Sequence, residues 1–417
     1  MNVKKKKIAF VINYFYPDFA STGQLMTELC LDLQNDFDIT VIAAQPNYAG
    51  GKVSSKKIFE EDRLENMKIV RIQLPEVDKT SKFSRMKYIF SYFALANIAL
   101  LKEKDIDMIY TISQPPVLGG LIGTIGKFLK RAKHVYNVQD FNPEQAAAVS
   151  YTNKQSIFKI AKKIDMVNCK YSDCVIVVGN DMSETLKQRF NGKKVPKHTV
   201  INNWTNEQEV IPLDKSNEHI QQFLKDNGLE DKFIIMYSGN IGLYYDLENI
   251  IHVTERFKEY KDIAFVFIGE GAVKKDMQSF AEDNNIQNVF FLPYQPKEFI
   301  KYSLNVADVH LVVNQKGIKG VSVPSKIYGV MAAGKPILGV LEQGSEAQML
   351  IEKSNSGIVV EPQDYNGIIH TIEQFYRMEE AKVKEMGLNG RKYLDENLKR
   401  EISINKYRNL LKQIAKS

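Results

Sequence analysis

The glycines of residues 237–242 have the spacing of a loop that could hold a phosphate group. The loop contains Gly239, Asn240 and Gly242, follows the apolar run 233–236 and precedes residues 247–257, whose apolar positions recur at helical spacing. Glycine at a strand-to-helix turn lets backbone N–H groups approach an anion, and the helix N-terminus behind them favours negative charge. The pattern therefore indicates a phosphate or diphosphate ligand, although a tight turn without any ligand can have the same sequence.

The sequence contains two successive series of alternating strand-like and helix-like segments, and the elements they predict must position this loop. Strand-like apolar runs in the first half lie at 8–14, 39–44, 67–74, 108–113, 134–138, 174–178 and 199–202. Those in the second half lie at 233–237, 264–268, 289–292, 309–313, 336–340 and 357–360. Such runs suit parallel strands covered on both faces, and their alternation with helices predicts an α/β protein with two Rossmann-like, doubly wound domains. Because these sheets bind ligands at the carboxyl ends of their strands, we expect the domains to face each other across a cleft.

The composition is that of a globular protein with an unevenly distributed charge. The 417 residues are 44% hydrophobic and 25% charged. The three cysteines have no metal-ligand spacing, and no apolar run approaches the roughly 18–20 residues of a membrane-spanning helix, so we expect a cytoplasmic protein. Residues 1–205 carry 30 Lys and Arg against 20 Asp and Glu, within a net charge of +6 for the chain. This basic half favours an anionic membrane surface over nucleic acid, because no nucleic-acid motif accompanies it.

Several segments resemble, in the expected order, the motifs of the GT-B glycosyltransferases. Residues 200–204 are similar to their interdomain hinge, and residues 239–242 and 268–271 are similar to their donor-phosphate loops. The remaining matches lie at 291–294, 306–309 and 324–336, of which the last is the most specific. The ordered set resembles glycosyltransferase family 4, and within it the branch that adds sugars to lipid-linked precursors of bacterial surface polysaccharides.

One departure from the family concerns a pair of carboxylates. Many members carry a Glu-x7-Glu pair, but Val321 and Gly329 stand at the equivalent positions. The resemblance implies that this branch uses a Pro-Ser-Lys motif instead, in which Lys326 supplies the positive charge that a leaving nucleoside diphosphate requires. A solvated lysine at a helix start is the alternative. Asn240 and Tyr245 occupy the places of the usual Arg and Lys of the donor loop.

The resemblance also implies two sets of binding residues. The donor-binding residues would be Gly239, Asn240, Gly242, Gly269, Glu270, Gly271, Tyr294, Ser325, Lys326 and Glu346. The acceptor-side residues would be Thr22, Gly23, Gln139, Asp140 and Glu144. We predict that Lys326 and Asp140 are catalytic, and that Asp140 accepts the hydroxyl proton or positions the acceptor. An N-cap or loop hydrogen-bond acceptor is the alternative for Asp140.

The segment 82–101 has the pattern of a helix that could lie in a membrane interface. Its first turn is basic, and aromatic and aliphatic residues recur at helical spacing. The residues predicted to contact lipid are Lys82, Phe83, Arg85, Lys87 and Phe90. Such a helix turns its charges toward anionic headgroups. The alternative is a core helix that covers the first sheet, as residues 98–101 are expected to do.

Taken over the whole chain, the resemblance implies a retaining, metal-independent hexosyltransferase without a cofactor. It would move a sugar, with N-acetylated amino and deoxy sugars as candidates, from a nucleotide diphosphate donor, with UDP preferred, to a polyprenyl diphosphate-linked saccharide. Capsule, O-antigen or exopolysaccharide synthesis would use such an enzyme on the inner face of the plasma membrane. Residues 1–205 would face acceptor and membrane, residues 206–390 would bind the nucleotide sugar, and a helix at 391–417 would cross back to the first domain. A GT-B nucleotide-sugar epimerase and a catalytically silent GT-B scaffold are the alternatives.

Overall fold

The computed structural model describes residues 5–18, 21–46, 57–77, 81–148 and 155–417, with the backbone alone at Ser21, Lys82 and Gln155. Contacts divide the chain into two compact units. Unit 1 comprises Met1–Asn202 with Ile404–Ser417, and unit 2 comprises Asn203–Ser403. Each unit has its own sheet.

Unit 1 is built on a sheet with the strand order β3-β4-β2-β1-β5-β6-β7-β8. Its strands are β1 (Lys7–Val11), β2 (Asp38–Ala44), β3 (Phe59–Leu64), β4 (Met67–Ile72), β5 (Met108–Ile112), β6 (Lys133–Val138), β7 (Cys174–Val177) and β8 (His198–Val200). Its helices are α1 (Ser21–Leu33), α2 (Lys82–Lys102), α3 (Leu118–Lys130), α4 (Asn142–Ala148), α5 (Gln155–Tyr171), α6 (Asn180–Phe190) and most of α15 (Arg400–Lys416).

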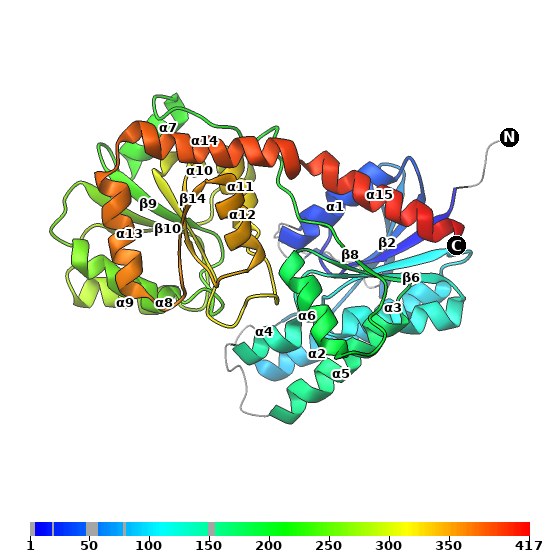
Figure 1. The fold of residues 1–417 in the computed structure, drawn as a ribbon. Coiled ribbons are helices and arrows are strands. Elements are labelled where there is room, and N and C mark those ends of the chain that lie inside the picture. Colours follow the sequence, from blue (N-terminus) through cyan, green and yellow to red (C-terminus); the bar gives the residue numbers. More distant parts are fainter. Residues whose placement is uncertain (1–4, 19–20, 47–56, 78–80, 149–154) are drawn as a thin grey trace. The chain divides into compact units, whose positions relative to one another are not determined.

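The direction of the crossovers decides which helices cover which face of this sheet. Helices α2, α3 and α5 connect strands that advance in one direction across the sheet, and right-handed crossovers therefore place them on one face. Helix α3 contacts both α2 and α5. Helix α1 connects strands in the opposite direction and covers the other face together with α15 (Figure 1). Strand β5, in the middle of the sheet, is buried at every residue, as expected for a strand covered on both faces.

Strand β3 is not predicted by the apolar patterns of the sequence. It pairs antiparallel with β4, from Phe59↔Ile72 to Leu64↔Met67, and forms one edge of the sheet. Its sequence, Phe-Glu-Glu-Asp-Arg-Leu, leaves the charged residues in the middle of the strand exposed. Charged side chains protect an edge strand from pairing with other chains. A strand of this kind has no apolar run, so hydrophobic periodicity does not detect it.

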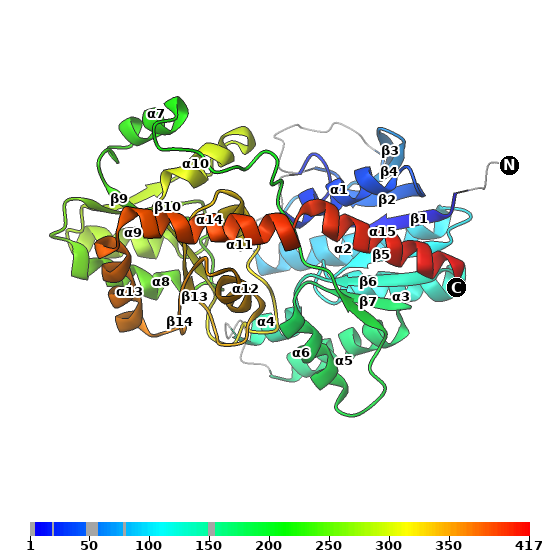
Figure 2. The same ribbon diagram turned by 45° about the horizontal axis from the view of Figure 1, so that its top comes forward.

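Unit 2 is built on a parallel sheet with the strand order β11-β10-β9-β12-β13-β14. Of these strands, β9, β10, β13 and β14 are labelled in Figure 2. Its strands are β9 (Phe233–Ser238), β10 (Ile263–Ile268), β11 (Val289–Leu292), β12 (Val309–Val313), β13 (Ile337–Val340) and β14 (Gly357–Val360). Its helices are α7 (Glu218–Asp226), α8 (Leu247–Ile250), η1 (Ile251–Phe257), α9 (Lys274–Asp283), η2 (Lys297–Phe299), α10 (Ile300–Val306), α11 (Lys326–Ala332), α12 (Glu346–Ser354), α13 (Tyr365–Arg377) and α14 (Glu380–Asn397). The structure confirms the predicted α/β class with two Rossmann-like domains.

The predicted helix over residues 247–257 is only partly correct. The α-helix α8 is short and continues as the 3-10 helix η1. Ile251, Thr254 and Phe257 are buried, and their three-residue spacing matches the three residues per turn of a 3-10 helix. Apolar spacing of three and four residues in the sequence did not distinguish the two helix types.

The C-terminal tail contains two helices rather than one. Helix α14 ends at Asn397, and α15 begins at Arg400. Arg391 of α14 donates to two backbone carbonyls of unit 2, each at 2.9 Å. Arg408 of α15 donates to the Asp36 carboxylate in unit 1 at 2.8 Å. These contacts fix α14 to unit 2 and the end of α15 to unit 1.

Candidate active site

The glycine loops after β9 and β10 lie side by side at the carboxyl edge of the sheet of unit 2. Strands β9 and β10 are parallel neighbours. The N–H of Gly239 donates to the carbonyl of Ile268 at 2.8 Å, and the N–H of Ile241 donates to the carbonyl of Glu270 at 2.9 Å. The two loops therefore form one surface at the edge where doubly wound sheets bind ligands.

Close packing explains the glycines of these loops. A Cβ on Gly269 would overlap the carbonyl oxygen of Gly239, and a Cβ on Gly271 would overlap the carbonyl oxygen of Ile241. Gly239 and Gly269 also have φ angles of +141° and +145°, which other residues rarely adopt. A Cβ on Gly239 would overlap Cε of Lys326. Glycine thus lets one loop pack on the other and lets the lysine side chain cross Gly239.

Lys326 is a partly buried cation held between aromatic rings. It begins α11, and its Nζ lies 4.1 Å from the ring centroid of Tyr245 and 4.8 Å from that of Tyr237. Among the described residues, no carboxylate lies within ion-pair distance of its ammonium group. Burial lowers the pKa of the Lys326 ammonium to about 7. The aromatic faces compensate only part of the lost hydration, so an anion placed here would gain a strong partner.

Tyr237 is a site residue that the sequence reasoning missed, and Tyr245 entered it only as a replacement for a basic residue. The hydroxyl of Tyr237 donates to the carbonyl of Asn240 at 2.6 Å, so this ring also supports the glycine loop. Tyr237 is the second-to-last residue of β9 and is buried. An aromatic residue beside the glycine loop was the available signal in the sequence.

The other predicted donor residues occupy different positions along the same edge. The Asn240 side chain lies against Gly242, where a Cβ would sit 2.8 Å from its Nδ2. The Glu270 side chain pairs with Lys274 at 2.7 Å. The hydroxyl of Tyr294, which is 53% exposed, donates to the carbonyl of Glu270 at 3.4 Å. These contacts keep Asn240, Glu270 and Tyr294 at the glycine loops.

Two predicted donor residues lie at helix starts beyond these loops. Ser325 is exposed and directly precedes α11, so it adjoins Lys326 along the chain. Glu346 is buried in the first turn of α12 after β13, which lies two strands from β9 in the sheet. Ser325 is thus next to the lysine, whereas Glu346 belongs to a more distant part of the same edge.

Asp140 follows β6 at the carboxyl edge of the sheet of unit 1. The N–H groups of Gln139 and Asp140 both donate to Oγ of Ser113, at 3.1 and 3.2 Å. Gln145 donates to the Asp140 carboxylate at 3.4 Å. Burial raises the pKa of Asp140 to about 6, since one long hydrogen bond does not offset the loss of water. A carboxyl group with this pKa can hold or release a proton near neutral pH. Ser113, which orients this turn, was not among the predicted site residues.

Gln139 is the first member of a buried chain of hydrogen bonds. Its Nε2 donates to Oδ1 of Asn137 at 3.1 Å. Asn137 in turn donates to the hydroxyls of Tyr110 at 2.6 Å and Tyr407 at 3.1 Å. Tyr407 belongs to α15, so the C-terminal helix supports the orientation of the Gln139 side chain.

Glu144 lies in a largely buried ion-pair network. This network gives the residue a structural role that requires no contact with a substrate. It accepts from Nε of Arg189 at 2.9 Å and from Nη2 of the same residue, and it pairs with Lys162 at 3.0 Å. Burial alone would raise the pKa of Glu144, but the hydrogen bonds and charges of Arg189 and Lys162 hold it below its usual range. Arg189 also donates to Asp165 at 2.6 Å. The structure therefore gives Glu144 a role in joining α4, α5 and α6.

Thr22 and Gly23, which were predicted to lie on the acceptor side, are inside the first turn of α1. A Cβ on Gly23 would sit 2.9 Å from the carbonyl oxygen of Tyr14. Gly23 also accepts a hydrogen bond from the Thr27 hydroxyl at 2.8 Å. Close packing against the chain after β1 therefore explains the glycine at position 23. Its neighbour Thr22 is partly exposed.

The predicted interface segment is the amphipathic helix α2. Phe83 and Phe90 are 78% and 55% exposed, and Arg85 and Lys87 are exposed beside them. The side chain of Lys82 lies outside the described residues. The opposite side of the helix, including Tyr92, Ala96 and Leu100, is buried in the core of unit 1. The helix therefore covers the sheet with one side and presents exposed apolar and basic residues with the other.

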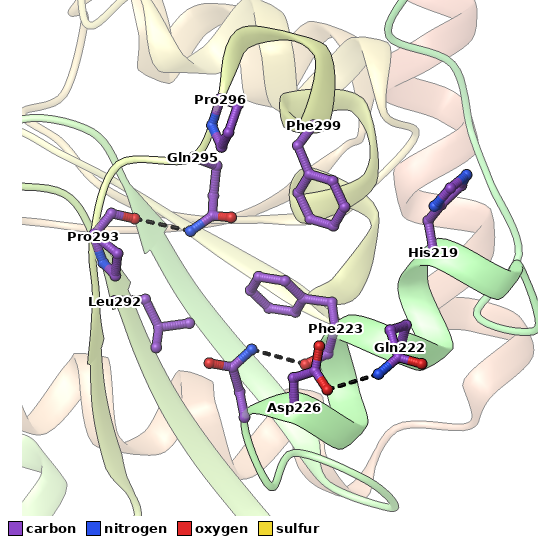
Figure 3. Close-up of a pocket in the computed structure, with 10 residues that line it drawn as sticks. His219, Gln222, Phe223, Asp226, Leu292, Pro293, Gln295, Pro296 and Phe299 are labelled. Carbon is purple, nitrogen blue, oxygen red and sulfur yellow. Dashed lines mark hydrogen bonds between the residues drawn. The ribbon is translucent and has the colours of Figure 1, made fainter.

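A surface pocket of about 440 Å³ lies elsewhere in unit 2, between α7 and the segment after β11 (Figure 3). Phe223 and Phe299 stack in it with their ring centroids 5.7 Å apart. Two of its polar side chains bond within the protein: Gln222 donates to the Asp226 carboxylate at 2.7 Å, and Gln295 donates to the carbonyl of Pro293 at 2.9 Å. None of the predicted site residues lines this pocket.

The described residues contain no group of three or more His, Cys, Asp and Glu side chains that could hold a metal ion. The helices in the described part of the chain are all too short or too polar to cross a membrane.

Comparison with solved structures identifies the fold class. Sucrose-phosphate synthase from Thermosynechococcus elongatus aligns with a TM-score of 0.78 at 15% identity, covering 98% of this chain and 99% of that one. HepE of Anabaena in complex with UDP and glucose aligns with a TM-score of 0.74 at 12% identity, covering 98% and 100%. These likenesses show that the protein has the GT-B fold.

Comparison of sequences identifies a domain family. Residues 219–393 match the family of glycosyl transferases group 1, so the chain contains a group 1 glycosyltransferase domain. It is 26% identical over 405 residues to WbjE of Pseudomonas aeruginosa, named as a glycosyltransferase, with 96% of each chain covered. It is 25% identical over 382 residues to WcaI of Escherichia coli (strain K12), named for colanic acid biosynthesis, with 88% of this chain and 91% of the relative covered.

Proposed function

We propose that the protein is a retaining, metal-independent glycosyltransferase of bacterial surface polysaccharide synthesis. It transfers a sugar from a UDP-sugar to a lipid-linked saccharide. Unit 2 binds the donor, and unit 1 binds the acceptor and the inner face of the membrane.

The observation that carries the donor assignment is the position of Lys326. The Lys326 side chain passes over Gly239, and its ammonium group lies near two aromatic rings. This ammonium group has no carboxylate partner among the described residues. A diphosphate bound at the glycine loops would provide the missing negative charge. As the bond between the sugar and the diphosphate breaks, charge on the leaving oxygen increases, and a fixed cation stabilises it without requiring a metal ion.

The proposed chemical step uses the acceptor side of unit 1. The acceptor hydroxyl oxygen attacks the anomeric carbon on the face that the diphosphate leaves, which retains the configuration. The hydroxyl proton passes to the leaving diphosphate. The Asp140 carboxylate hydrogen-bonds the acceptor hydroxyl and positions it, and Gln139, held by Asn137, lies beside it.

The names of similar proteins support the choice of nucleotide and of pathway. HepE is solved with UDP and glucose. A further structural relative, from E. coli, aligns with a TM-score of 0.71 and is solved bound with UDP-2-fluoro glucose. WcaI is named for the synthesis of colanic acid. The exposed Phe83, Arg85 and Lys87 of α2 support membrane contact by the acceptor-binding unit.

Thermal unfolding with UDP in the presence of a chelator tests the donor site. Bound ligand at 100 times its Kd should stabilise the native state by about 2.7 kcal/mol. Lys326→Ala should lose most of this effect, and it should lower turnover with a UDP-sugar and a lipid-linked acceptor by about 10²–10³-fold. Stabilisation that disappears on adding chelator would contradict metal independence. UDP binding without turnover on any lipid-linked acceptor would instead favour a binding scaffold.

A further inference from the structure

Helix α5 presents a row of apolar side chains on the surface of unit 1. Ile157, Ile160 and Val167 are 50%, 59% and 42% exposed. At its end, the ring of Tyr171 meets the ring of Phe128 edge-on, with the centroids 5.5 Å apart. Phe128 and its neighbour Leu129, near the end of α3, are 59% and 60% exposed. The two helices therefore share one apolar surface, which we call the α5 face.

Basic residues alternate with the apolar residues of the α5 face. Lys159, Lys163 and Lys170 of α5 are exposed, as is Arg131 directly after α3. The only acidic residue in the sequence of α5 is Asp165, which is buried and bonded to Arg189. The exposed side of α5 is therefore apolar and basic without a carboxylate.

The inner side of α5 is fixed to the rest of unit 1. Besides its bond to Arg189, Asp165 accepts from the hydroxyl of Tyr136 at 2.7 Å. Lys162 pairs with Glu144 of α4 at 3.0 Å. These contacts determine which side of the helix faces outward, and α4 begins two residues after Asp140. The α5 face is thus a rigid surface, one helix away from the Asp140 turn.

We propose that the α5 face is a second membrane-contact surface that binds an anionic lipid bilayer, in addition to the exposed residues of α2. Aliphatic and aromatic side chains interleaved with lysines suit the boundary between acyl chains and anionic headgroups. A second copy of the chain fits less well, because lysine is depleted in the cores of protein interfaces. Helices α2, α3 and α5 cover the same face of the sheet, and α3 contacts both of the others (Figure 1). Both surfaces can therefore contact one bilayer.

Vesicle sedimentation of the full chain tests this inference. One variant removes charge, with Lys159→Gln, Lys163→Gln and Lys170→Gln. A second removes apolar surface, with Ile157→Gln, Ile160→Gln and Val167→Gln. The matched control changes exposed lysines of unit 2, with Lys258→Gln, Lys275→Gln and Lys297→Gln. Vesicles of phosphatidylcholine with phosphatidylglycerol are compared with vesicles of phosphatidylcholine alone.

The charge variant should bind the anionic vesicles on the order of a hundred-fold more weakly, because each surface lysine contributes about fivefold. The apolar variant should also bind more weakly, and the control should bind like the parent. Binding by both α5 variants that equals the parent overturns the inference, as does a parent protein that binds neither type of vesicle. A parent dimer that the α5 variants dissociate, with no change in vesicle binding, assigns the face to a second copy and also overturns it. Thermal stabilisation by UDP should persist in all variants, so failure here is separable from failure of the donor site.

Discussion

Binding of UDP should be coupled to the uptake of nearly one proton at pH 8, and Lys326 should be the group that takes it up. Burial lowers the pKa of its ammonium group to about 7, so one pH unit above this value about nine-tenths of the free protein has a neutral lysine. A diphosphate beside the amine favours its charged form and raises the pKa. Lys326 should therefore take up about 0.9 proton at pH 8 and close to none at pH 6, where it is already mostly protonated.

The same shift predicts how affinity and stability depend on pH. Above pH 7 the affinity for UDP should fall by up to about tenfold per pH unit, because protonating Lys326 then costs free energy. The phosphate itself is fully ionised in this range, since its second pKa is about 6. The stability of the free protein changes in the opposite direction. The unfolded lysine, with its ordinary pKa of 10.5, binds more protons than the folded one between about pH 7 and 10.5, so this group makes the free energy of unfolding rise with pH there.

Calorimetric titration in two buffers with different ionisation enthalpies measures the proton uptake directly. Lys326→Met should bind UDP weakly and without uptake, and Lys326→Arg should bind without uptake because arginine stays charged. Lys335 is a matched control: burial lowers its pKa to about 8, but it precedes β13 at the opposite edge of the sheet. Lys335→Met should leave the uptake unchanged. Uptake below about 0.2 proton in the parent at pH 8, or full uptake in Lys326→Met, would refute this reasoning.

Three further predictions concern stability. Gly269→Ala should destabilise unit 2 by several kcal/mol in urea unfolding, because its Cβ would overlap a backbone carbonyl. The control Gly192→Ala has a φ of +75° and open space around it, so it should cost only about 1 kcal/mol. Equal costs for the two variants would mean that the glycine loops can separate. Asp140→Asn should be more stable than the parent by about 1–3 kcal/mol at pH 7 but not at pH 4. The pKa of Asp140 is about 6 in the folded protein against an ordinary 3.8, so the free energy of unfolding of the parent falls as pH rises between these values. Parallel curves of unfolding free energy against pH for the two proteins would disprove the pKa shift. Arg189→Met should cost about 3–5 kcal/mol, since it leaves the buried Asp165 carboxylate without its cation and leaves Glu144 with Lys162 alone, whereas Lys187→Met, in an exposed pair, should hardly change the urea midpoint; a small cost for both would show that water replaces the arginine.

Prediction from the sequence succeeded where an element carries its own signal. Strand β10 is buried at every residue, and its continuous apolar run identifies it without knowledge of its neighbours. The glycine loops after β9 and β10 were recognisable because each follows such a strand. Strand β3 was missed because it is stabilised by pairing with β4 at an edge, which leaves no pattern in its own residues.

The roles of the predicted site residues depended on partners that are distant in the sequence. Glu144 had the pattern of an acceptor-side carboxylate, but Arg189, 45 residues further along the chain, occupies it. Asp140 came from the same short string, yet burial with one weak hydrogen bond leaves it able to titrate near pH 6. Nothing in the local sequence separates these two carboxylates.

The sequence by itself determined the order of the strands along the chain, the places where glycine is needed and the presence of a lysine at the start of α11. Only the tertiary structure decided that Lys326 crosses Gly239 and lies between the rings of Tyr237 and Tyr245. The physical reason is that hydrophobic periodicity and glycine geometry act over a few neighbouring residues. Burial and electrostatic environment, by contrast, are set by groups that folding brings together from separate strands, and these determine whether a side chain is charged.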